Sequence, residues 1–137
     1  ASMSTTVQQR IQAFLEAGPF AVVGASTDRD KYGNKVLRCY RQHGLEVFPI
    51  NPREAEVEGL PAFASLSDLP KLPRAVSIIT PPAVTERVLR EAAGLGIRHL
   101  WLQPGAEGPA ALDAAETLGL EVIAGGPCLL VVLGYHE

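Results

Sequence analysis

The segment Phe20-Ala21-Val22-Val23-Gly24-Ala25-Ser26 indicates the fold. Its apolar part is brief, contains two β-branched valines and ends at a glycine, which is typical of a short buried strand followed by a turn. Similar apolar runs recur at residues 46–50, 75–79, 98–102 and 120–123. The sequence therefore predicts five buried strands.

Segments with helical spacing separate these runs. After the third run, Val84, Val88, Ala92 and Leu95 form one apolar stripe. Strands that alternate with helices pair in parallel through right-handed crossovers, because the chain must cross a face of the sheet before each new strand. This organisation predicts an α/β fold, a doubly wound three-layer sandwich with a five-stranded parallel sheet. The strand order expected for this fold class is 3-2-1-4-5.

The N-terminal part of the chain predicts an amphipathic helix from Thr5 to Ala17, which ends at Gly18-Pro19. We expect residues 1–18 to form a helix packed on a domain of residues 19–137, with a single domain overall, because 137 residues support only one.

The connection between the second and third runs is the least regular part of the chain. The segment Ser65-Leu66-Ser67-Asp68 matches a capping box, so a short helix is expected there before Pro70 and Pro73.

Composition excludes several classes of protein. The net charge is −3, which provides no basic surface for nucleic acid. The longest strongly apolar run, residues 122–133, is interrupted by Gly125 and Gly126 and is too short to cross a membrane. The polar start of the chain does not resemble a secretion signal, and two cysteines fit a reducing compartment. We therefore expect a cytoplasmic protein without nucleic-acid or membrane partners.

Ligands of open α/β sheets bind outside the carboxyl ends of the strands. The residues after the first four predicted strands are small, rigid or amide-bearing, and they lack the paired carboxylates or histidines of acid–base catalysis. They are Gly24-Ala25-Ser26, Asn51-Pro52-Arg53, Thr80-Pro81-Pro82 and Gln103-Pro104-Gly105. The pattern favours a binding crevice over a catalytic site.

The first of these loops joins a buried strand to a helix, where phosphates commonly bind to free N–H groups. Its spacing is not G-x-G-x-x-G, because Ser26 and Arg29 stand where the second and third glycines would be. Alternatively, Gly24 serves only a tight turn, and Arg29 and Lys31 are solvated loop charges.

The end of the second strand carries Asn51-Pro52-Arg53 in place of the acidic residue that holds the ribose in NAD-binding domains. An amide followed by a cation is compatible with a phosphorylated ribose, either the 2′-phosphate of NADP or the 3′-phosphate of coenzyme A (CoA). The alternative is a surface arginine paired with Glu54 or Glu56.

The third and fourth strand ends offer further contacts. Pro81 and Pro82 give either a flat apolar wall for a ligand or a rigid corner at a helix start. Gln103 could supply a donor and an acceptor to the crevice, whereas Trp101 is expected in the core.

Reactive side chains outside these loops do not predict an enzyme. Cys128 is expected to be a small buried thiol at a helix start, and Cys39 a structural residue within a helix. His43, His99 and His136 lack metal-ligand spacing, so no metal is expected.

Taken in order, five elements resemble the small, single-domain CoA-binding proteins of bacteria and archaea. They are Val22–Ser26, Lys31-Tyr32-Gly33-Asn34, Val47–Pro52, Thr80–Pro82, and Trp101–Gly105 together with Cys128. These proteins are similar in turn to the Rossmann-like, CoA-binding N-terminal domain of the succinyl-CoA synthetase α subunit. That domain has Gly-Pro-Asn-Cys where this chain reads Gly125-Gly126-Pro127-Cys128.

The resemblance implies that CoA places its diphosphate over Gly24–Ser26, its 3′-phospho-ADP end near Asn51–Arg53 and its pantetheine arm along Thr80–Pro82. The expected cofactor-binding residues are Gly24, Ala25, Ser26, Arg29, Lys31, Tyr32, Gly33, Asn51, Pro52, Arg53, Thr80, Pro81, Pro82 and Gln103.

Three functions remain open from the sequence. The first is a non-catalytic CoA-binding or acyl-CoA-binding protein, because the phosphohistidine domain of the synthetase is not part of this sequence. The second is an NADP-dependent oxidoreductase or redox sensor, which the same fold permits. The third is a subunit that becomes catalytic only with a partner enzyme.

Overall fold

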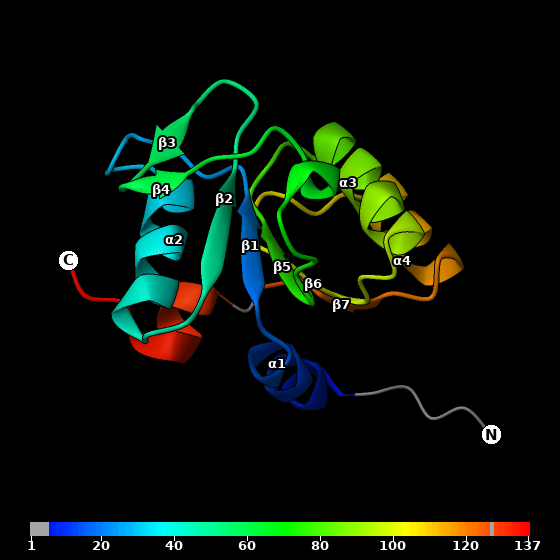
Figure 1. Cartoon of the computed structure of the whole chain (residues 1–137). Helices are drawn as coiled ribbons and strands as arrows, with labels where there is room; N and C mark the ends of the chain where they lie inside the picture. Colours follow the sequence, from blue (N-terminus) through cyan, green and yellow to red (C-terminus); the bar gives the residue numbers. More distant parts are fainter. Residues whose placement is uncertain (1–5, 127) are drawn as a thin grey trace.

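Five short strands form one parallel sheet in the structure, a computed structural model that describes residues 6–126 and 128–137 (Figure 1). Each strand is three or four residues long and mostly buried, as expected for a sheet covered on both faces. The strands are β1 (Phe20–Val23), β2 (Val47–Ile50), β5 (Ala75–Ile78), β6 (His99–Leu102) and β7 (Glu121–Ile123).

The strands lie in the order β2-β1-β5-β6-β7, so the predicted order 3-2-1-4-5 is wrong. The third strand along the chain, β5, pairs with β1 and not with β2. The outer edge of β2 is already occupied by Phe63, whose N–H donates to the Pro49 carbonyl at 3.1 Å and whose carbonyl accepts from Asn51 N at 2.9 Å. Connections from β1 and β2 therefore leave in opposite directions, and a crevice opens at their carboxyl ends.

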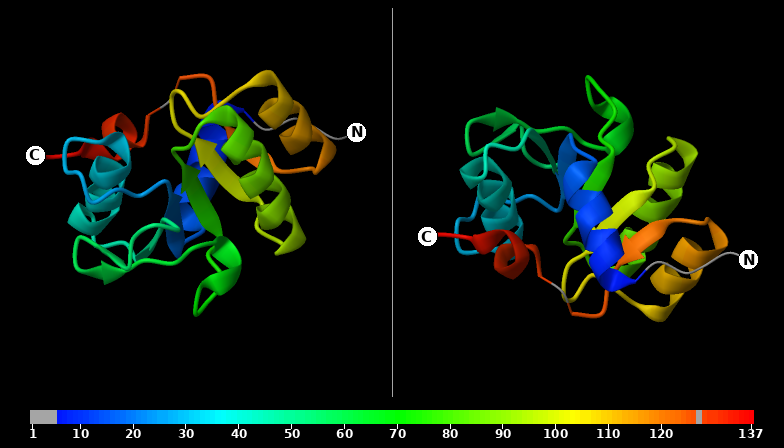
Figure 2. Two further views of the ribbon diagram at one scale, coloured as in Figure 1. Left: turned by 90° about the horizontal axis from the view of Figure 1, so that it is seen from above. Right: turned by 90° about the horizontal axis from the view of Figure 1, so that it is seen from below.

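In the part of the chain that the structure describes, four α-helices and two short helical turns cover the two faces of the sheet (Figure 2). Helices α1 and α2 and the turn η2 share one hydrophobic core, whereas α3, α4 and η1 share the other. The predicted three-layer α/β sandwich is therefore confirmed. The elements are α1 (Val7–Glu16), α2 (Tyr32–Gln42), α3 (Pro82–Gly94), α4 (Pro109–Thr117), η1 (Leu66–Asp68) and η2 (Leu130–Gly134).

Helix α1 lies against β6 and β7. Its start is a capping box in which Thr6 accepts from the Gln9 N–H, and its buried face includes Phe14. The Phe14 ring meets Trp101 edge-on with 5.3 Å between centroids, and both side chains are fully buried, so Trp101 belongs to the core as predicted. Residues 1–5 of the predicted N-terminal segment lie outside the described residues.

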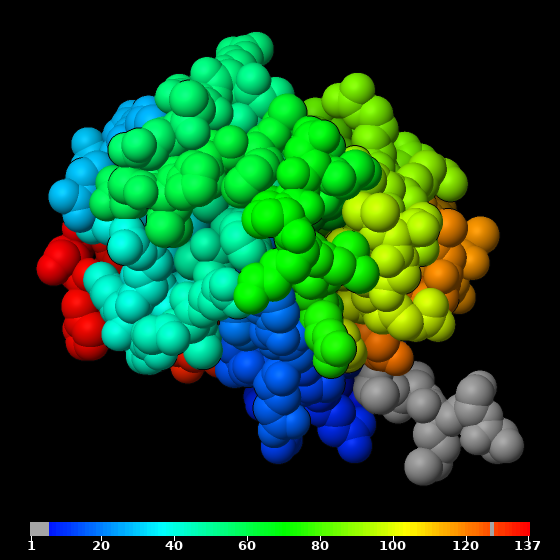
Figure 3. Space-filling view, in the orientation of Figure 1, coloured from blue at the N-terminus to red at the C-terminus, as the bar shows by residue number. Residues whose placement is uncertain are grey.

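The segment between β2 and β5 contains a hairpin that the sequence did not predict. Strands β3 (Glu56–Val57) and β4 (Leu60–Pro61) pair antiparallel around Glu58-Gly59. The predicted short helix is a single turn, η1, and its capping box does not form, because Ser65 Oγ donates to the Asp68 carboxylate at 3.0 Å. Figure 3 shows this segment, in green, lying between α2 and α3.

No helix in residues 6–126 or 128–137 combines the length and apolar character needed to cross a membrane.

Stability at alkaline pH should reflect two buried groups of α2. Burial raises the pKa of the Cys39 thiol to about 11, and burial also raises the pKa of the Tyr40 phenol. Above about pH 8.5 the Cys39 thiol of an unfolded chain loses its proton while that of the folded chain keeps it, so the free energy of unfolding must fall as the pH rises. Urea denaturation from pH 7 to 10.5 measures this slope.

The variant Cys39→Ala is expected to lose stability less steeply over the same pH range, because the contribution of the Cys39 thiol is absent. An identical slope in both proteins would contradict the role of the thiol.

Candidate functional site

A cavity of about 350 Å³ opens at the carboxyl ends of β2, β1 and β5. This volume lies within the range of about 300–1,000 Å³ that is typical of small-molecule sites. Five of the residues predicted from the sequence line it together, namely Gly24, Asn51, Pro52, Arg53 and Thr80. Residues from three separate loops therefore meet at the strand ends, where the sequence placed the crevice.

Two glycines bring the start of α2 against the end of β1. Gly24 has a φ of +94°, and a Cβ there would stand 2.2 Å from the Ile79 carbonyl oxygen. A Cβ on Gly33 would stand 2.0 Å from the Gly24 carbonyl oxygen. Gly33 thus permits the close helix–strand packing that the third glycine permits in a G-x-G-x-x-G loop.

This packing leaves a group of main-chain donors at the bend between β1 and α2. The N–H groups of Ala25, Ser26, Tyr32 and Gly33 donate no hydrogen bond to another described residue. Unpaired N–H groups at the positive end of a helix dipole favour an anion. The bend therefore has the chemistry of a phosphate site, although its spacing differs from the dinucleotide motif.

A side-chain network that the sequence did not predict holds this bend in place. Asn34 is fully buried, and its Nδ2 donates to the Ser26 carbonyl at 2.8 Å and to Glu58 Oε2 at 3.1 Å. Asn34 stood in the motif from Lys31 to Asn34, but its partner Glu58 comes from the unpredicted hairpin. Arg29 lies 3.7 Å from the Glu58 carboxylate and is mostly exposed, and Lys31 is exposed as well.

The end of β2 is fastened to the end of β1 by Asn51. Its Nδ2 donates to the Ala25 carbonyl at 2.8 Å, and its Oδ1 accepts from the Arg53 N–H at 2.8 Å. The Arg53 side chain is exposed, and among the described residues it forms no ion pair with Glu54 or Glu56. The guanidinium is therefore available to an anion at the cavity mouth.

The end of β5 contributes Thr80, but the two prolines after it do not line the cavity. Pro82 is the first residue of α3 and Pro81 its N-cap, and both are exposed. The rigid helix corner that the sequence allowed is therefore present. The apolar wall of the cavity is formed by residues missing from the prediction, chiefly Leu66, Val84 and Val88.

Glu91 of α3 also lines the cavity and was not predicted. Its Oε1 accepts from the Leu66 N–H at 3.4 Å and its Oε2 from the Ser67 hydroxyl at 2.9 Å, so it holds η1 against α3. The sequence alone does not predict this contact. Residues 66 and 91 are far apart in the chain, and the path of the connection from β2 to β5 brings them together.

We expect Glu91→Ala to lower the free energy of unfolding by about 1 kcal/mol, because it leaves the N–H of buried Leu66 without its acceptor. Urea denaturation measures the loss. Glu86→Ala, which removes only a surface pair with Arg90, is the matched control and should cost less than about 0.5 kcal/mol. Equal stability of the two variants would contradict this role of Glu91.

Gln103 lies at the end of β6, outside the cavity lining, and is fully buried. Tyr32 approaches its Oε1 at 3.4 Å and also touches the Cys128 thiol. Cys128 is half-buried and precedes Leu129 and η2, while Pro127 lies outside the described residues. Cys128 was predicted to be a buried thiol and is only half-buried, whereas Cys39 lies within α2, as predicted, and is buried.

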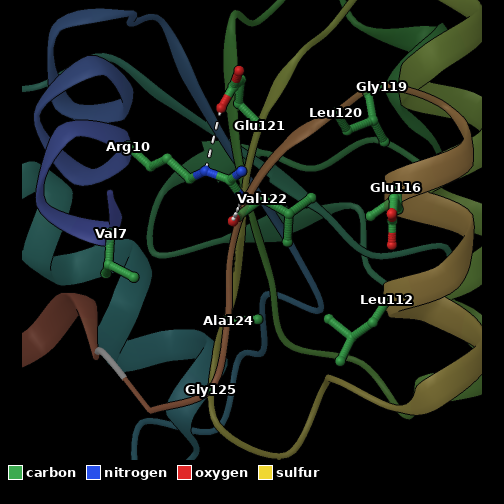
Figure 4. Close-up of a pocket in the computed structure, with 11 residues that line it drawn as sticks. Val7, Arg10, Leu112, Glu116, Gly119, Leu120, Glu121, Val122, Ala124 and Gly125 are labelled. Carbon is green, nitrogen blue, oxygen red and sulfur yellow. Dashed lines mark hydrogen bonds and ion pairs between the residues drawn. The ribbon is translucent and has the colours of Figure 1, made fainter. Parts of the chain in front are cut away.

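A second, larger cavity of about 650 Å³ lies at the other side of the molecule, between α1, α4 and β7 (Figure 4). Arg10 spans it and donates to Glu121 Oε2 at 3.3 Å and to the Val122 carbonyl at 2.7 Å. None of the predicted site residues lines it. We assign the candidate site to the smaller cavity, because it is lined by predicted residues from the ends of β1, β2 and β5 and the larger cavity is not.

Metal-binding groups do not gather in the described part of the chain, where no three His, Cys, Asp or Glu residues are arranged to hold an ion. His43 follows α2 and contacts the Gly134 carbonyl at 2.8 Å, and His99 begins β6.

Comparison with known proteins identifies the family of this chain. A family model described as a CoA binding domain matches residues 19–134. The α subunit of an ADP-forming acetate–CoA ligase II from Pyrococcus furiosus is 27% identical over 134 residues, which cover 90% of this chain and 29% of that protein. The chain thus spans less than a third of the length of the curated relatives that it matches.

Two solved structures are similar over nearly their whole length. A conserved hypothetical protein of Pyrococcus furiosus is 39% identical with a TM-score of 0.77, covering 82% of this chain and 97% of that one. A hypothetical protein of Pyrococcus horikoshii is 26% identical with a TM-score of 0.85, covering 93% and 89%. With the Rossmann-like sheet and the matched family model, these findings show that the chain belongs to the family of CoA-binding domains.

Proposed function

We propose that this protein binds CoA or an acyl-CoA at the carboxyl edge of its sheet. The observation that carries the proposal is the cavity lined by Gly24 and the unpaired Arg53, together with the free N–H groups of the β1–α2 bend that follows Gly24. CoA and NADP both carry a diphosphate and a separate phosphate on the adenosine ribose. Membership of the CoA-binding family makes CoA the first candidate among them.

The parts of the ligand can be assigned to parts of the site. The diphosphate binds the N–H groups of Ala25, Ser26, Tyr32 and Gly33, with the exposed Arg29 and Lys31 nearby. The 3′-phosphate lies at Asn51–Arg53, where a guanidinium can form charge-assisted hydrogen bonds. The adenine occupies the apolar part of the cavity beside Val84 and Val88. The pantetheine arm leaves the cavity past Thr80 and passes the exposed Pro81 and Pro82.

The protein holds this ligand without catalysing a reaction of its own. The matched region is less than a third of the acetate–CoA ligase subunit, so we do not assign the activity of that subunit to this chain. No pair of side chains in the described cavity lining has the arrangement of a general acid and base, since its one carboxylate, Glu91, is bound to η1. The protein would act in the cytoplasm as a carrier, a sensor or a binding module for an acyl-CoA enzyme.

Isothermal titration calorimetry with CoA, acetyl-CoA, NADP and NAD tests the proposal. We expect one molecule of CoA to bind per chain, with acetyl-CoA similar and with NADP and NAD much weaker. Binding of NADP without a response to CoA would replace the proposal with the oxidoreductase alternative.

A further inference from the structure

Three chain segments bring a thiol, a phenol and an amide together beyond the end of β6. Tyr32 begins α2, Gln103 follows β6 and Cys128 follows β7. The Tyr32 hydroxyl touches Cys128 Sγ and lies 3.4 Å from Gln103 Oε1. We call these three residues the thiol cluster. None of its three residues lines the 350 Å³ cavity, which we call the nucleotide cavity, so we assign the thiol cluster no contact with the adenine or the ribose.

One atom of the thiol cluster has no partner. Gln103 is fully buried, and its Nε2 makes no hydrogen bond with any described residue. The amide cannot be turned around, because its Oε1 accepts from the Leu129 N–H at 3.2 Å. In a turned amide, Nε2 would face this N–H, and two donors would then point at each other. A buried donor without an acceptor costs about 1–3 kcal/mol. The donor beside Tyr32 and Cys128 therefore indicates a ligand that offers an acceptor there.

The thiol cluster lies within reach of a long ligand in the nucleotide cavity. Strand β6 pairs directly with β5, whose end lines the cavity. Neighbouring strands are about 4.8 Å apart, so the ends of β2 and β6 are separated by three spacings, about 14 Å. A CoA molecule with its nucleotide at Arg53 would extend its pantetheine arm along this row of strand ends. That arm carries amide carbonyls, which are acceptors, and ends in a thiol.

We propose, building on the proposed function, that Cys128 forms a reversible mixed disulfide with CoA. The Cys128 thiolate attacks the CoA sulfur of a CoA disulfide, the S–S bond of that disulfide breaks, and a bond forms between Cys128 Sγ and the CoA sulfur. The departing thiolate takes up a proton, so one disulfide is consumed and one is formed. A small reducing thiol reverses the step. The protein would thereby retain CoA covalently under oxidising conditions and release it when the mixed disulfide is reduced.

Tyr32 is placed to assist this exchange. Burial and the contact with Cys128 raise the pKa of the Tyr32 phenol, so the phenol stays protonated and can donate to sulfur as negative charge develops there. Cys39 is unsuited to the reaction, because it is fully buried and its pKa is raised to about 11. The two cysteines therefore provide an internal comparison.

The test treats the reduced protein with CoA disulfide and measures its intact mass without reductant. We expect one CoA adduct per chain, removed by dithiothreitol, absent in Cys128→Ser and retained in Cys39→Ala. Tyr32→Phe should form the adduct about tenfold more slowly, as expected for loss of a hydrogen bond to a charged sulfur. Cystamine, a disulfide without a nucleotide, should react far more slowly than CoA disulfide at equal concentration.

Titration of Cys128→Ser with reduced CoA separates the two proposals. Binding of CoA as in the unmodified protein, together with a Cys128 adduct only in the unmodified protein, supports both. Three results would overturn the proposed disulfide but not the proposed function. They are CoA binding without an adduct, an adduct on Cys39, and equal reaction rates with cystamine and CoA disulfide. Absence of CoA binding in both proteins rejects the proposed function and the disulfide with it.

Discussion

Gly33→Ala should destabilise the protein by about 3 kcal/mol and abolish measurable CoA binding. The new Cβ would lie 2.0 Å from the Gly24 carbonyl oxygen, which is backbone and cannot rotate away. The start of α2 must then move from the end of β1, and the N–H groups at the bend no longer converge. Alanine gains about 1 kcal/mol over glycine in helix propensity, but this gain is smaller than the cost of the clash. Urea denaturation and calorimetry with CoA measure the two effects.

The matched control is Gly94→Ala at the last residue of α3. A Cβ there meets nothing within 4 Å, so the same chemical change should leave stability equal or slightly higher and CoA binding unchanged. If Gly33→Ala bound CoA as tightly as Gly94→Ala, the close approach of α2 to β1 would not be what forms the phosphate site.

Arg53→Ala should weaken CoA binding about tenfold, the lower end of what a hydrogen bond to a charged group contributes, because the side chain is exposed. The loss should come entirely from the 3′-phosphate. The unaltered protein should therefore bind 3′-dephospho-CoA about tenfold more weakly than CoA, and Arg53→Ala should bind both ligands equally. Calorimetric titration of the two proteins with the two ligands measures this.

Arg74→Ala removes the same charge from an exposed residue just before β5, at the opposite end of the strands, and serves as the control. It should leave both affinities unchanged. An Arg53→Ala protein that still preferred CoA over 3′-dephospho-CoA tenfold would show that another group holds the phosphate.

The sequence predicted the layers of the fold but not the arrangement of its edge. Short runs of apolar residues predicted buried strands such as β1, and the helical spacing of apolar residues predicted α3 and α4. The strand order depends instead on whether the outer edge of β2 is free to pair with β5. In the structure Phe63 pairs with that edge, and nothing in the sequence around Phe63 predicts this pairing.

The same distinction applies to the candidate site. Gly24, Asn51, Arg53 and Thr80 could be predicted because each directly follows a recognisable strand. The residues that support them from a distance, such as Glu58 on Asn34, could not, since their positions depend on the unpredicted hairpin. The glycine that allows the close helix packing lies at Gly33 because the loop is longer than a dinucleotide motif, so a search for fixed glycine spacing misses it.

The most direct test of the CoA site is a titration of ¹⁵N-labelled protein with CoA, followed through the backbone amide resonances. If CoA binds at the β1–α2 bend, the largest shifts are expected at Ser26, Tyr32 and Gly33, with further changes at Arg53 and Thr80. Shifts confined to Arg10, Glu116 and Val122, around the larger cavity, would contradict it.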